Sequence, residues 1–210
     1  MNRLAVIVPV KSAGKKSRLS PLLSPPERRE FAISLFTELM GTLAKAGLIR
    51  SCRVVSSDRE VLAAASTLGA VPIPERSDSG VNSAVRLGMR DAPEASEYLV
   101  LPSDLPLLRA SDLRGLLRLR DGRPGVVISP SAGFDGTNAL IFPRVPRFPL
   151  SYDRDSFWKH LGGASRLGLR VGVCARERIM FDVDSPDDLR RLAAAGARGG
   201  SAEIARGATS

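Results

Sequence analysis

Residues 4 to 10 form a continuous apolar run, and this run constrains the fold more than any other feature of the sequence. A strand with apolar side chains on both faces has to be buried on both faces, as in a parallel sheet covered by helices. Further short apolar runs alternate with segments of helical periodicity, such as residues 27 to 46. The alternation predicts an α/β fold with three layers (αβα), in which helices cover both faces of a mostly parallel central sheet.

A length of 210 residues fits one domain with a sizeable core. We predict a single domain over residues 1–195, followed by a disordered tail over residues 196–210, which are small, polar and rich in glycine. The N-terminal apolar run is typical of a strand rather than a signal peptide, and no run approaches membrane-spanning length. Cys52 and Cys174 each lie within an apolar run, which is typical of reduced core thiols. We therefore expect a cytoplasmic protein that does not associate with membranes.

Basic residues outnumber acidic ones by 31 to 22, which gives a formal net charge of +9. Clustered cations attract phosphates, so this excess suits either a nucleic-acid binder or an enzyme that handles small polyanions. The basic residues are spread along the chain, and only 5% of all residues are aromatic, so side chains for base stacking are scarce. The pattern favours a small polyanionic ligand and no nucleic acid, with a basic nucleic-acid-binding module kept as the non-enzyme alternative.

The loop after the first predicted strand carries four cations and a glycine between residues 11 and 18. Ligands of open α/β sheets bind at the carboxyl ends of the strands, where this loop begins. Its ammonium and guanidinium groups, chiefly Lys11, Lys16 and Arg18, could wrap a triphosphate. The loop lacks the Walker A pattern, and a merely solvated loop is an equally good interpretation of this segment alone.

Two acidic segments offer ligands for a divalent cation. Asp104 follows an apolar strand and lies between two prolines, so its backbone is stiff. Asp182 and Asp184 alternate with apolar residues on a possible strand over residues 179–183, so they are expected to face the same side. Carboxylates that share a side repel one another unless a cation lies between them, and Mg²⁺ prefers such oxygen ligands. We assign Asp187 and Asp188 to the positive end of the following helix instead.

Two further features have both a structural and a functional interpretation. Thr137 and Asn138 follow Gly136, and their hydroxyl and amide could contact a phosphate or a carboxylate, although a hairpin turn is equally compatible. His160 is the only histidine, and it lies between apolar residues of a predicted helix. A histidine in that setting is more often packed or capping than catalytic.

Five segments in sequence order resemble the signatures of the 2-phospho-L-lactate guanylyltransferase family, and the resemblance runs from residue 4 to about residue 192. The segments are Val8-Pro9-Val10-Lys11, Lys16-Ser17-Arg18-Leu19, Pro102-Ser103-Asp104-Leu105-Pro106, Gly136-Thr137-Asn138-Ala139-Leu140, and residues 182–189. The resemblance implies a glycosyltransferase-A-like sheet of the nucleotide-diphospho-sugar transferase type. It also implies a homodimer, and a reaction in coenzyme F-420 biosynthesis in which GTP and a phosphorylated three-carbon acid give a guanosine diphospho-acid and pyrophosphate.

The resemblance also implies roles for individual residues. Asp104, Asp182 and Asp184 match the metal-binding acids, and Thr137 and Ser156 match positions that hold the acid substrate. Gly80 and Asn82 resemble a stretch that faces the nucleotide. The chain departs from the family's Phe-Gly-x-Gly-Ser-Phe pattern over residues 152–157, where Asp153 and Asp155 replace both glycines. The acceptor therefore stays open among 2-phospho-L-lactate, phosphoenolpyruvate and 3-phospho-D-glycerate.

These observations together predict a Mg²⁺-dependent nucleotidyltransferase. Lys11, Lys16 and Arg18 would hold the β and γ phosphates of GTP while the acceptor phosphate attacks the α phosphorus. No strong general base is needed, because a phosphate monoester with a second pKa of about 6 is already largely dianionic at neutral pH. A nucleotidyltransferase acting on molybdopterin or a sugar phosphate, and a glycosyltransferase on the same fold, remain alternatives among enzymes.

Overall fold

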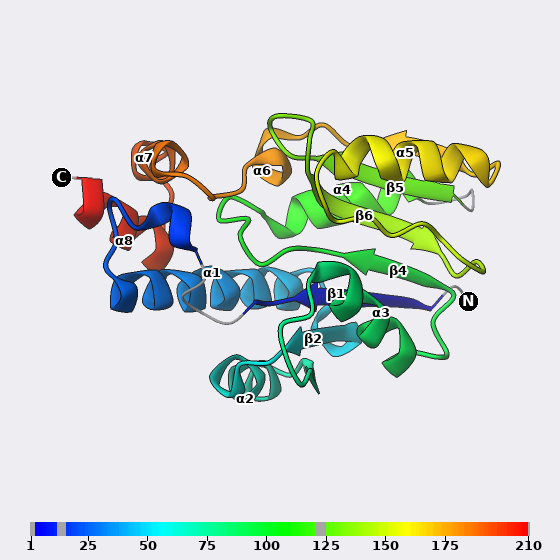
Figure 1. The fold of residues 1–210 in the computed structure, drawn as a ribbon, viewed down its shortest axis with the longest axis horizontal. Coiled ribbons are helices and arrows are strands. Elements are labelled where there is room, and N and C mark those ends of the chain that lie inside the picture. Colours follow the sequence, from blue (N-terminus) through cyan, green and yellow to red (C-terminus); the bar gives the residue numbers. More distant parts are fainter. Residues whose placement is uncertain (1–2, 12–15, 121–124, 210) are drawn as a thin grey trace.

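A computed structural model describes residues 3–11, 16–120 and 125–209 of the chain. Strands and helices alternate through most of these residues, as the sequence predicts (Figure 1). The strands are β1 (Leu4–Pro9), β2 (Cys52–Ser56), β3 (Val71–Pro74), β4 (Glu97–Val100), β5 (Gly125–Pro130), β6 (Thr137–Pro143) and β7 (Arg170–Val173). The helices are α1 (Pro25–Lys45), α2 (Arg59–Thr67), α3 (Val81–Asp91), α4 (Ala110–Arg120), α5 (Ser156–Arg166), α6 (Glu177–Met180), α7 (Pro186–Ala194) and α8 (Gly200–Thr209), with 3-10 turns η1 (Ser17–Leu19) and η2 (Ile49–Ser51).

The strands form one seven-stranded sheet in the order β3-β2-β1-β4-β6-β5-β7. All neighbouring strands are parallel except β6, which runs antiparallel to both β4 and β5. An antiparallel strand begins at the edge where its parallel neighbours end. The first residues of β6 therefore lie at the same edge as the carboxyl ends of β1 and β4, where a ligand is expected in such sheets.

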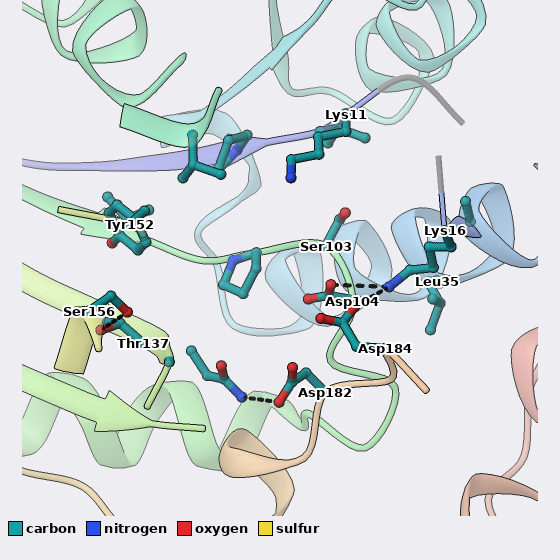
Figure 2. Close-up of a pocket in the computed structure, with 18 of the residues that line it drawn as sticks. Lys11, Lys16, Leu35, Ser103, Asp104, Thr137, Tyr152, Ser156, Asp182 and Asp184 are labelled. Carbon is teal, nitrogen blue, oxygen red and sulfur yellow. Dashed lines mark hydrogen bonds and ion pairs between the residues drawn. The ribbon is translucent and has the colours of Figure 1, made fainter. Parts of the chain in front are cut away.

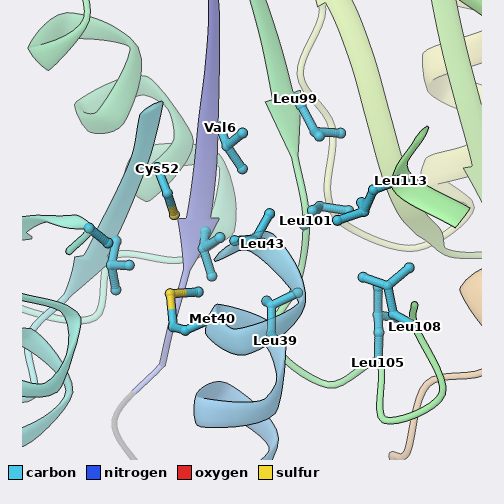
Figure 3. Packing of buried hydrophobic residues seen from close by; sticks show 14 of the residues in the cluster. Val6, Leu39, Met40, Leu43, Cys52, Leu99, Leu101, Leu105, Leu108 and Leu113 are labelled. Carbon is cyan, nitrogen blue, oxygen red and sulfur yellow. The ribbon is translucent and has the colours of Figure 1, made fainter. Parts of the chain in front are cut away.

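Helices cover both faces of the sheet, so the predicted three-layer α/β arrangement is confirmed. On one face, Leu39, Met40 and Leu43 of α1 pack with Leu113 of α4 against buried side chains of β1, β2 and β4 (Figure 3). On the other face, α3 and α5 pack against the opposite side chains of β1, β4 and β6. This double covering explains why the residues of β1 are apolar at consecutive positions.

A third apolar cluster lies beyond the sheet, where α7 and α8 meet the first half of α1 (Figure 1). The prediction of a disordered tail is wrong, because residues 200–209 form α8. Ala205 of α8 is buried in this cluster, and Ser201 Oγ donates a hydrogen bond of 2.6 Å to Glu38 of α1. Alanines at helical spacing form a narrow buried face of α8 against α1. Because the other residues of this segment are mostly polar or small, its average hydropathy does not indicate that face.

The predicted strand over residues 179–183 is also wrong. Residues 177–180 form the short helix α6, and residues 181–184 belong to no helix or strand. The Val183 N–H instead donates to the carbonyl of Asp104 at 3.3 Å. The helix that follows begins at a capping box, in which Ser185 N–H donates to Asp188 Oδ2 at 2.9 Å. Asp187 and Asp188 thus lie in the first helical turn, as predicted.

The pairing of β5 with β6 contains one extra residue at the start of β6. Ser129 pairs with Ala139, but Pro130 pairs with Thr137, so Asn138 has no partner of its own. Such a bulge re-aims side chains next to it. Ala139 packs on the α1 side of the sheet, whereas Thr137 contacts α5 on the other side. None of the helices in the described part of the chain is long and apolar enough to cross a membrane.

Candidate active site

A cavity of about 450 Å³ opens at the carboxyl ends of β1 and β4, beside the start of β6. Its size lies within the usual range for small-molecule sites. Residues after β1, after β4 and before α7 line it together, including Lys11, Ser103, Asp104, Asp182 and Asp184 (Figure 2). The loop after β1, the loop after β4 and the segment before α7 therefore meet at one edge of the sheet. Gly14 and Lys15 of the first loop lie outside the described residues.

One side of the cavity is built from charged groups, and we name Lys16, Asp104, Asp182 and Asp184 the carboxylate wall. The Lys16 ammonium lies 3.2 Å from Asp104 Oδ2 and 3.2 Å from Asp184 Oδ1, and it donates to the Val183 carbonyl at 2.6 Å (Figure 2). Lys16 thus holds the loop after β4 to the segment before α7. Such a bridge brings together two acids that are 80 positions apart in the sequence.

The electrostatics of the carboxylate wall favour a further positive charge. Burial, together with the neighbouring Asp104 and Asp184 carboxylates, raises the pKa of Asp182 to about 6, although a hydrogen bond from Asn138 opposes the shift. Burial alone would lower the pKa of the Lys16 ammonium, but the carboxylates of Asp104 and Asp184 outweigh it and raise that pKa. One ammonium therefore does not compensate the three carboxylates fully, and a cation would stabilise the ionised form of Asp182.

Among the described residues, no three side chains of His, Cys, Asp or Glu are grouped so as to hold a metal ion as they stand. The Lys16 ammonium lies between Asp104 and Asp184 instead. Mg²⁺ usually binds one or two carboxylates plus substrate phosphates rather than a complete protein cage. The hard oxygen donors, the raised pKa of Asp182 and the cavity beside them fit that mode of binding. The assignment of Mg²⁺ to Asp104, Asp182 and Asp184 stays a prediction.

The opposite side of the cavity carries hydroxyl groups, and we name Thr137, Tyr152 and Ser156 the hydroxyl wall. Ser156 Oγ donates to Thr137 Oγ1 at 3.0 Å, and both side chains are buried (Figure 2). His160 lies behind them, fully buried, with Nδ1 at 3.0 Å from Thr137 Oγ1. Burial lowers the pKa of His160 to about 4, so the ring is neutral near pH 7.

Asn138 of β6 connects the carboxylate wall to the sheet. Its Nδ2 donates to the Ile179 carbonyl and to Asp182 Oδ1, each at 3.0 Å. Sequence reasoning expected this amide to contact substrate, and Asn138 does line the cavity. Both of its amide hydrogens are used within the protein, however. Asn138 therefore positions Asp182, which has no strand to hold it.

The remaining candidates lie at or near the cavity rim. Lys11 and Arg18 line it, and both side chains are exposed. Gly80 is the N-cap residue of α3 and has a φ of 88°, a left-handed conformation that suits glycine. Asn82 Oδ1 accepts from the Tyr152 N–H at 2.9 Å, so it supports the hydroxyl wall from behind. Neither Gly80 nor Asn82 is among the lining residues, whereas Val81 between them is.

A family described as "Guanylyl transferase CofC like" matches residues 4–206. The chain belongs to this family. A phosphoenolpyruvate guanylyltransferase from Rubrobacter xylanophilus is 42% identical, over 90% of this chain and 93% of that protein. A 2-phospho-L-lactate guanylyltransferase from Methanothermobacter thermautotrophicus is 33% identical, over 91% of this chain and 84% of that protein. The predicted family is confirmed, and with it the class of nucleotidyltransferases.

Solved structures confirm the fold of this CofC-like chain. A nucleotide-diphospho-sugar transferase from Desulfovibrio desulfuricans matches with a TM-score of 0.76 at 14% identity, over 99% of this chain and 95% of that chain. A CMP-2-keto-3-deoxy-manno-octonic acid synthetase in complex with CTP matches with a TM-score of 0.62 at 15% identity, over 92% of this chain and 98% of that chain. The expected nucleotide-diphospho-sugar transferase fold is therefore correct.

Sequence reasoning did not single out three contributors to the cavity. Ser103 is part of the Pro102-Ser103-Asp104 motif without a pattern of its own, the Val183 carbonyl has no side-chain signal, and Tyr152 lies where the family pattern Phe-Gly-x-Gly-Ser-Phe begins with phenylalanine. The Tyr152 hydroxyl is buried and lacks a hydrogen-bond partner among the described residues. A tyrosine in place of phenylalanine beside Ser156 was the one available signal for it.

Proposed function

We propose that this chain is a guanylyltransferase that joins the guanylyl group of GTP to the phosphate of a small phosphorylated three-carbon acid, with phosphoenolpyruvate as the first candidate. The observation that carries the proposal is one cavity with a charged carboxylate wall facing a neutral hydroxyl wall. The charged groups of the carboxylate wall suit a transfer between two phosphates. The hydroxyl groups of the hydroxyl wall suit the orientation of an acid acceptor. The identity of 42% to a phosphoenolpyruvate guanylyltransferase supports this choice of acceptor.

The proposed reaction forms one bond and breaks one. An oxygen of the acceptor phosphate attacks the α phosphorus of GTP in line, and the bond between the α phosphorus and the bridging oxygen to the β phosphorus breaks. The products are a guanosine diphospho-acid and pyrophosphate. In this family the product leads toward coenzyme F-420. The acceptor phosphate is already an anion at neutral pH, so no residue has to remove a proton from it.

The main barrier is the repulsion between two anionic reactants. Two unit charges 4 Å apart repel by about 4 kcal/mol at an effective dielectric constant of 20. Lys11, Lys16 and Arg18 lie at the mouth and on one wall of the cavity, where they can bind the β and γ phosphates. Asp104, Asp182 and Asp184 would hold Mg²⁺, which supplies positive charge to the phosphate oxygens when bound. Lys16 can then turn from the carboxylates to the leaving pyrophosphate.

The test is the mass of the product. The purified protein is incubated with GTP, Mg²⁺ and either phosphoenolpyruvate, 2-phospho-L-lactate or 3-phospho-D-glycerate, and pyrophosphate release is followed in parallel. We expect pyrophosphate together with a guanosine diphospho-acid from one of the three acids. Release of GDP would indicate cleavage between the β and γ phosphates of GTP instead of guanylyl transfer, and a lack of product with all three acids would refute the proposed acceptor class. ATP, CTP and UTP serve as controls for base choice, and light scattering on a sizing column checks the expected homodimer.

A further inference from the structure

Three buried residues form a chain of hydrogen bonds that leads from the backbone to the cavity. The Ser151 N–H lies 3.0 Å from His160 Nε2, and His160 Nδ1 lies 3.0 Å from Thr137 Oγ1. Ser156 Oγ donates to the same threonine oxygen at 3.0 Å. Thr137 and Ser156 line the cavity, whereas His160 does not reach it.

The first bond of the chain fixes the tautomer of His160. A backbone N–H can only donate, so Nε2 must accept and cannot carry a proton. A neutral imidazole has one N–H, which therefore lies on Nδ1. The ring is fully buried and contacts the rings of Phe148 and Tyr152, which is a setting that disfavours a second proton. His160 Nδ1 consequently donates to Thr137 Oγ1.

The second step fixes the direction of the Thr137 hydroxyl. A hydroxyl oxygen has two lone pairs and one proton. Both lone pairs are used, one by His160 Nδ1–H and one by the Ser156 hydroxyl. No described residue accepts a hydrogen bond from the Thr137 hydroxyl, so its proton is left to point into the cavity.

We propose that His160 is a positioning residue that makes the Thr137 hydroxyl an obligate hydrogen-bond donor toward an anionic oxygen of the acid acceptor. The inference rests on the proposed function, because it assigns the acceptor to the hydroxyl wall. It also changes the role of Ser156, whose proton is used on Thr137 rather than on substrate. A site with a fixed hydrogen-bond donor prefers a carboxylate or phosphate oxygen, which accepts the bond. It discriminates against a ligand group that is itself a hydrogen-bond donor.

Two substitutions of His160 separate its two bonds. The amide of asparagine branches at the same carbon as Nδ1, so His160→Asn can still donate to Thr137 but cannot reach the Ser151 N–H. The amide of glutamine branches one carbon further, where Nε2 lies, so His160→Gln can still accept from Ser151 but loses the donor to Thr137. Each variant keeps one of the two contacts, which makes the pair a matched control for packing and folding.

The experiment measures KM separately for phosphoenolpyruvate and for GTP in both variants. We expect His160→Gln to raise KM for the acid by about tenfold, the effect of one hydrogen bond to a charged group, with KM for GTP unchanged. His160→Asn is expected to keep KM for the acid near that of the unaltered enzyme. Equal effects of the two variants, or a parallel rise of KM for GTP, would refute the positioning role and indicate a structural one.

A second measurement is independent of activity. His160 is the only histidine of the chain, so selective ¹⁵N labelling of histidine gives one pair of ring nitrogens to assign. Long-range ¹H–¹⁵N spectra of the ligand-free protein should show a protonated Nδ1 and an unprotonated Nε2. The opposite tautomer would overturn the inference even if the enzyme proves active. The expected tautomer combined with no guanylylated product would instead show that the proposed function is what failed.

Discussion

The carboxylate wall and the hydroxyl wall of the cavity are held in place by different forces. The carboxylate wall consists of charged groups around a single ammonium, and the side chain of Asp184 is half-exposed. The hydroxyl wall consists of neutral groups, and Thr137, Ser156 and the supporting His160 are 6%, 3% and 0% exposed. Ion pairs near solvent rearrange at little cost, whereas buried hydrogen-bond networks resist rearrangement. We infer that the carboxylate wall adapts when phosphates bind, while the hydroxyl wall is already set for its ligand.

The largest effect is expected from Asp104→Asn, which removes a negative charge from the carboxylate wall. The substitution keeps the size of the side chain but weakens both the contact with Lys16 and any contact with a cation. We expect kcat/KM for GTP to fall by about 100- to 1000-fold, as when one group that stabilises a transition-state charge is removed. Pyrophosphate release measures this loss.

The matched control is Asp187→Asn, because Asp187 lies in the first turn of α7 with its side chain 86% exposed. It should leave kcat/KM unchanged. A similar loss in both variants would point to a general effect of net charge rather than to a role of Asp104.

Asn138→Ala is expected to have the next largest effect, because it releases Asp182 from β6. The Ile179 carbonyl and Asp182 Oδ1 both lose their donor. Loss of a group that orients a metal ligand usually weakens metal binding by about 10- to 100-fold. The Mg²⁺ concentration for half-maximal activity should rise by that factor, and the free energy of unfolding should fall by about 1–3 kcal/mol.

Leu192→Ala is a useful comparison for this variant. Leu192 is fully buried in the cluster between α1, α7 and α8, away from the sheet. The substitution should destabilise the protein by about 2–5 kcal/mol and leave the Mg²⁺ requirement as it was. An unchanged Mg²⁺ requirement in Asn138→Ala would contradict the positioning role of Asn138.

The two walls should also respond to pH in opposite directions. Between pH 6.5 and about 4, the unfolded chain binds a proton at His160 that the folded chain does not, so this residue makes the folded state less stable as the pH falls. The pKa of Asp182 is raised from 3.8 to about 6, so the folded state binds the extra proton there and gains stability as the pH falls.

Urea unfolding at pH 7 and pH 4.5 separates the two contributions. Relative to His160→Gln, the unaltered protein should lose on the order of 2 kcal/mol of stability between pH 7 and pH 4.5. Relative to Asp182→Asn, it should gain stability over the same interval. Differences that do not depend on pH would mean that neither group has the shifted pKa.

The smallest effect is expected from Tyr152→Phe. The Tyr152 hydroxyl is buried without a partner among the described residues, and burial raises its pKa well above the usual value, so it stays a neutral donor. A buried donor without a partner is costly, and its removal should raise the free energy of unfolding by up to about 1 kcal/mol. A clear loss of stability in thermal unfolding would show that the hydroxyl has a partner after all.

The sequence predicted those features of the fold and the site that depend on the residues of a single segment. The apolar residues of β1 require a covered sheet, and the parallel strands then bring Lys11 and Asp104 to one edge. Asp187 and Asp188 in the first turn of α7 could be separated from Asp182 and Asp184, because helix starts favour acids through the helix dipole.

Contacts between distant segments could not be predicted in this way. The bridge from Lys16 to Asp184 depends on how two loops fold over one another, which no local pattern specifies. Residues 179–183 alternate like a strand, but α6 takes up residues 177–180 and the Val183 N–H bonds to the carbonyl of Asp104 instead of to a strand. The helix α8 is stabilised by packing against α1, so its own residues did not predict a helix.

The extra residue at the start of β6 has a further consequence for how this site could change. Asn138 occupies a place in the chain but none in the pairing of β5 with β6. Deleting Asn138 would make the strand regular. Thr137 would then directly precede Ala139, and because neighbouring side chains of a strand face opposite sides, Thr137 would still face α5. The sheet would gain continuity, and Asp182 would lose its tether to the sheet. At this one position, a more regular and more stable strand and a working site are alternatives.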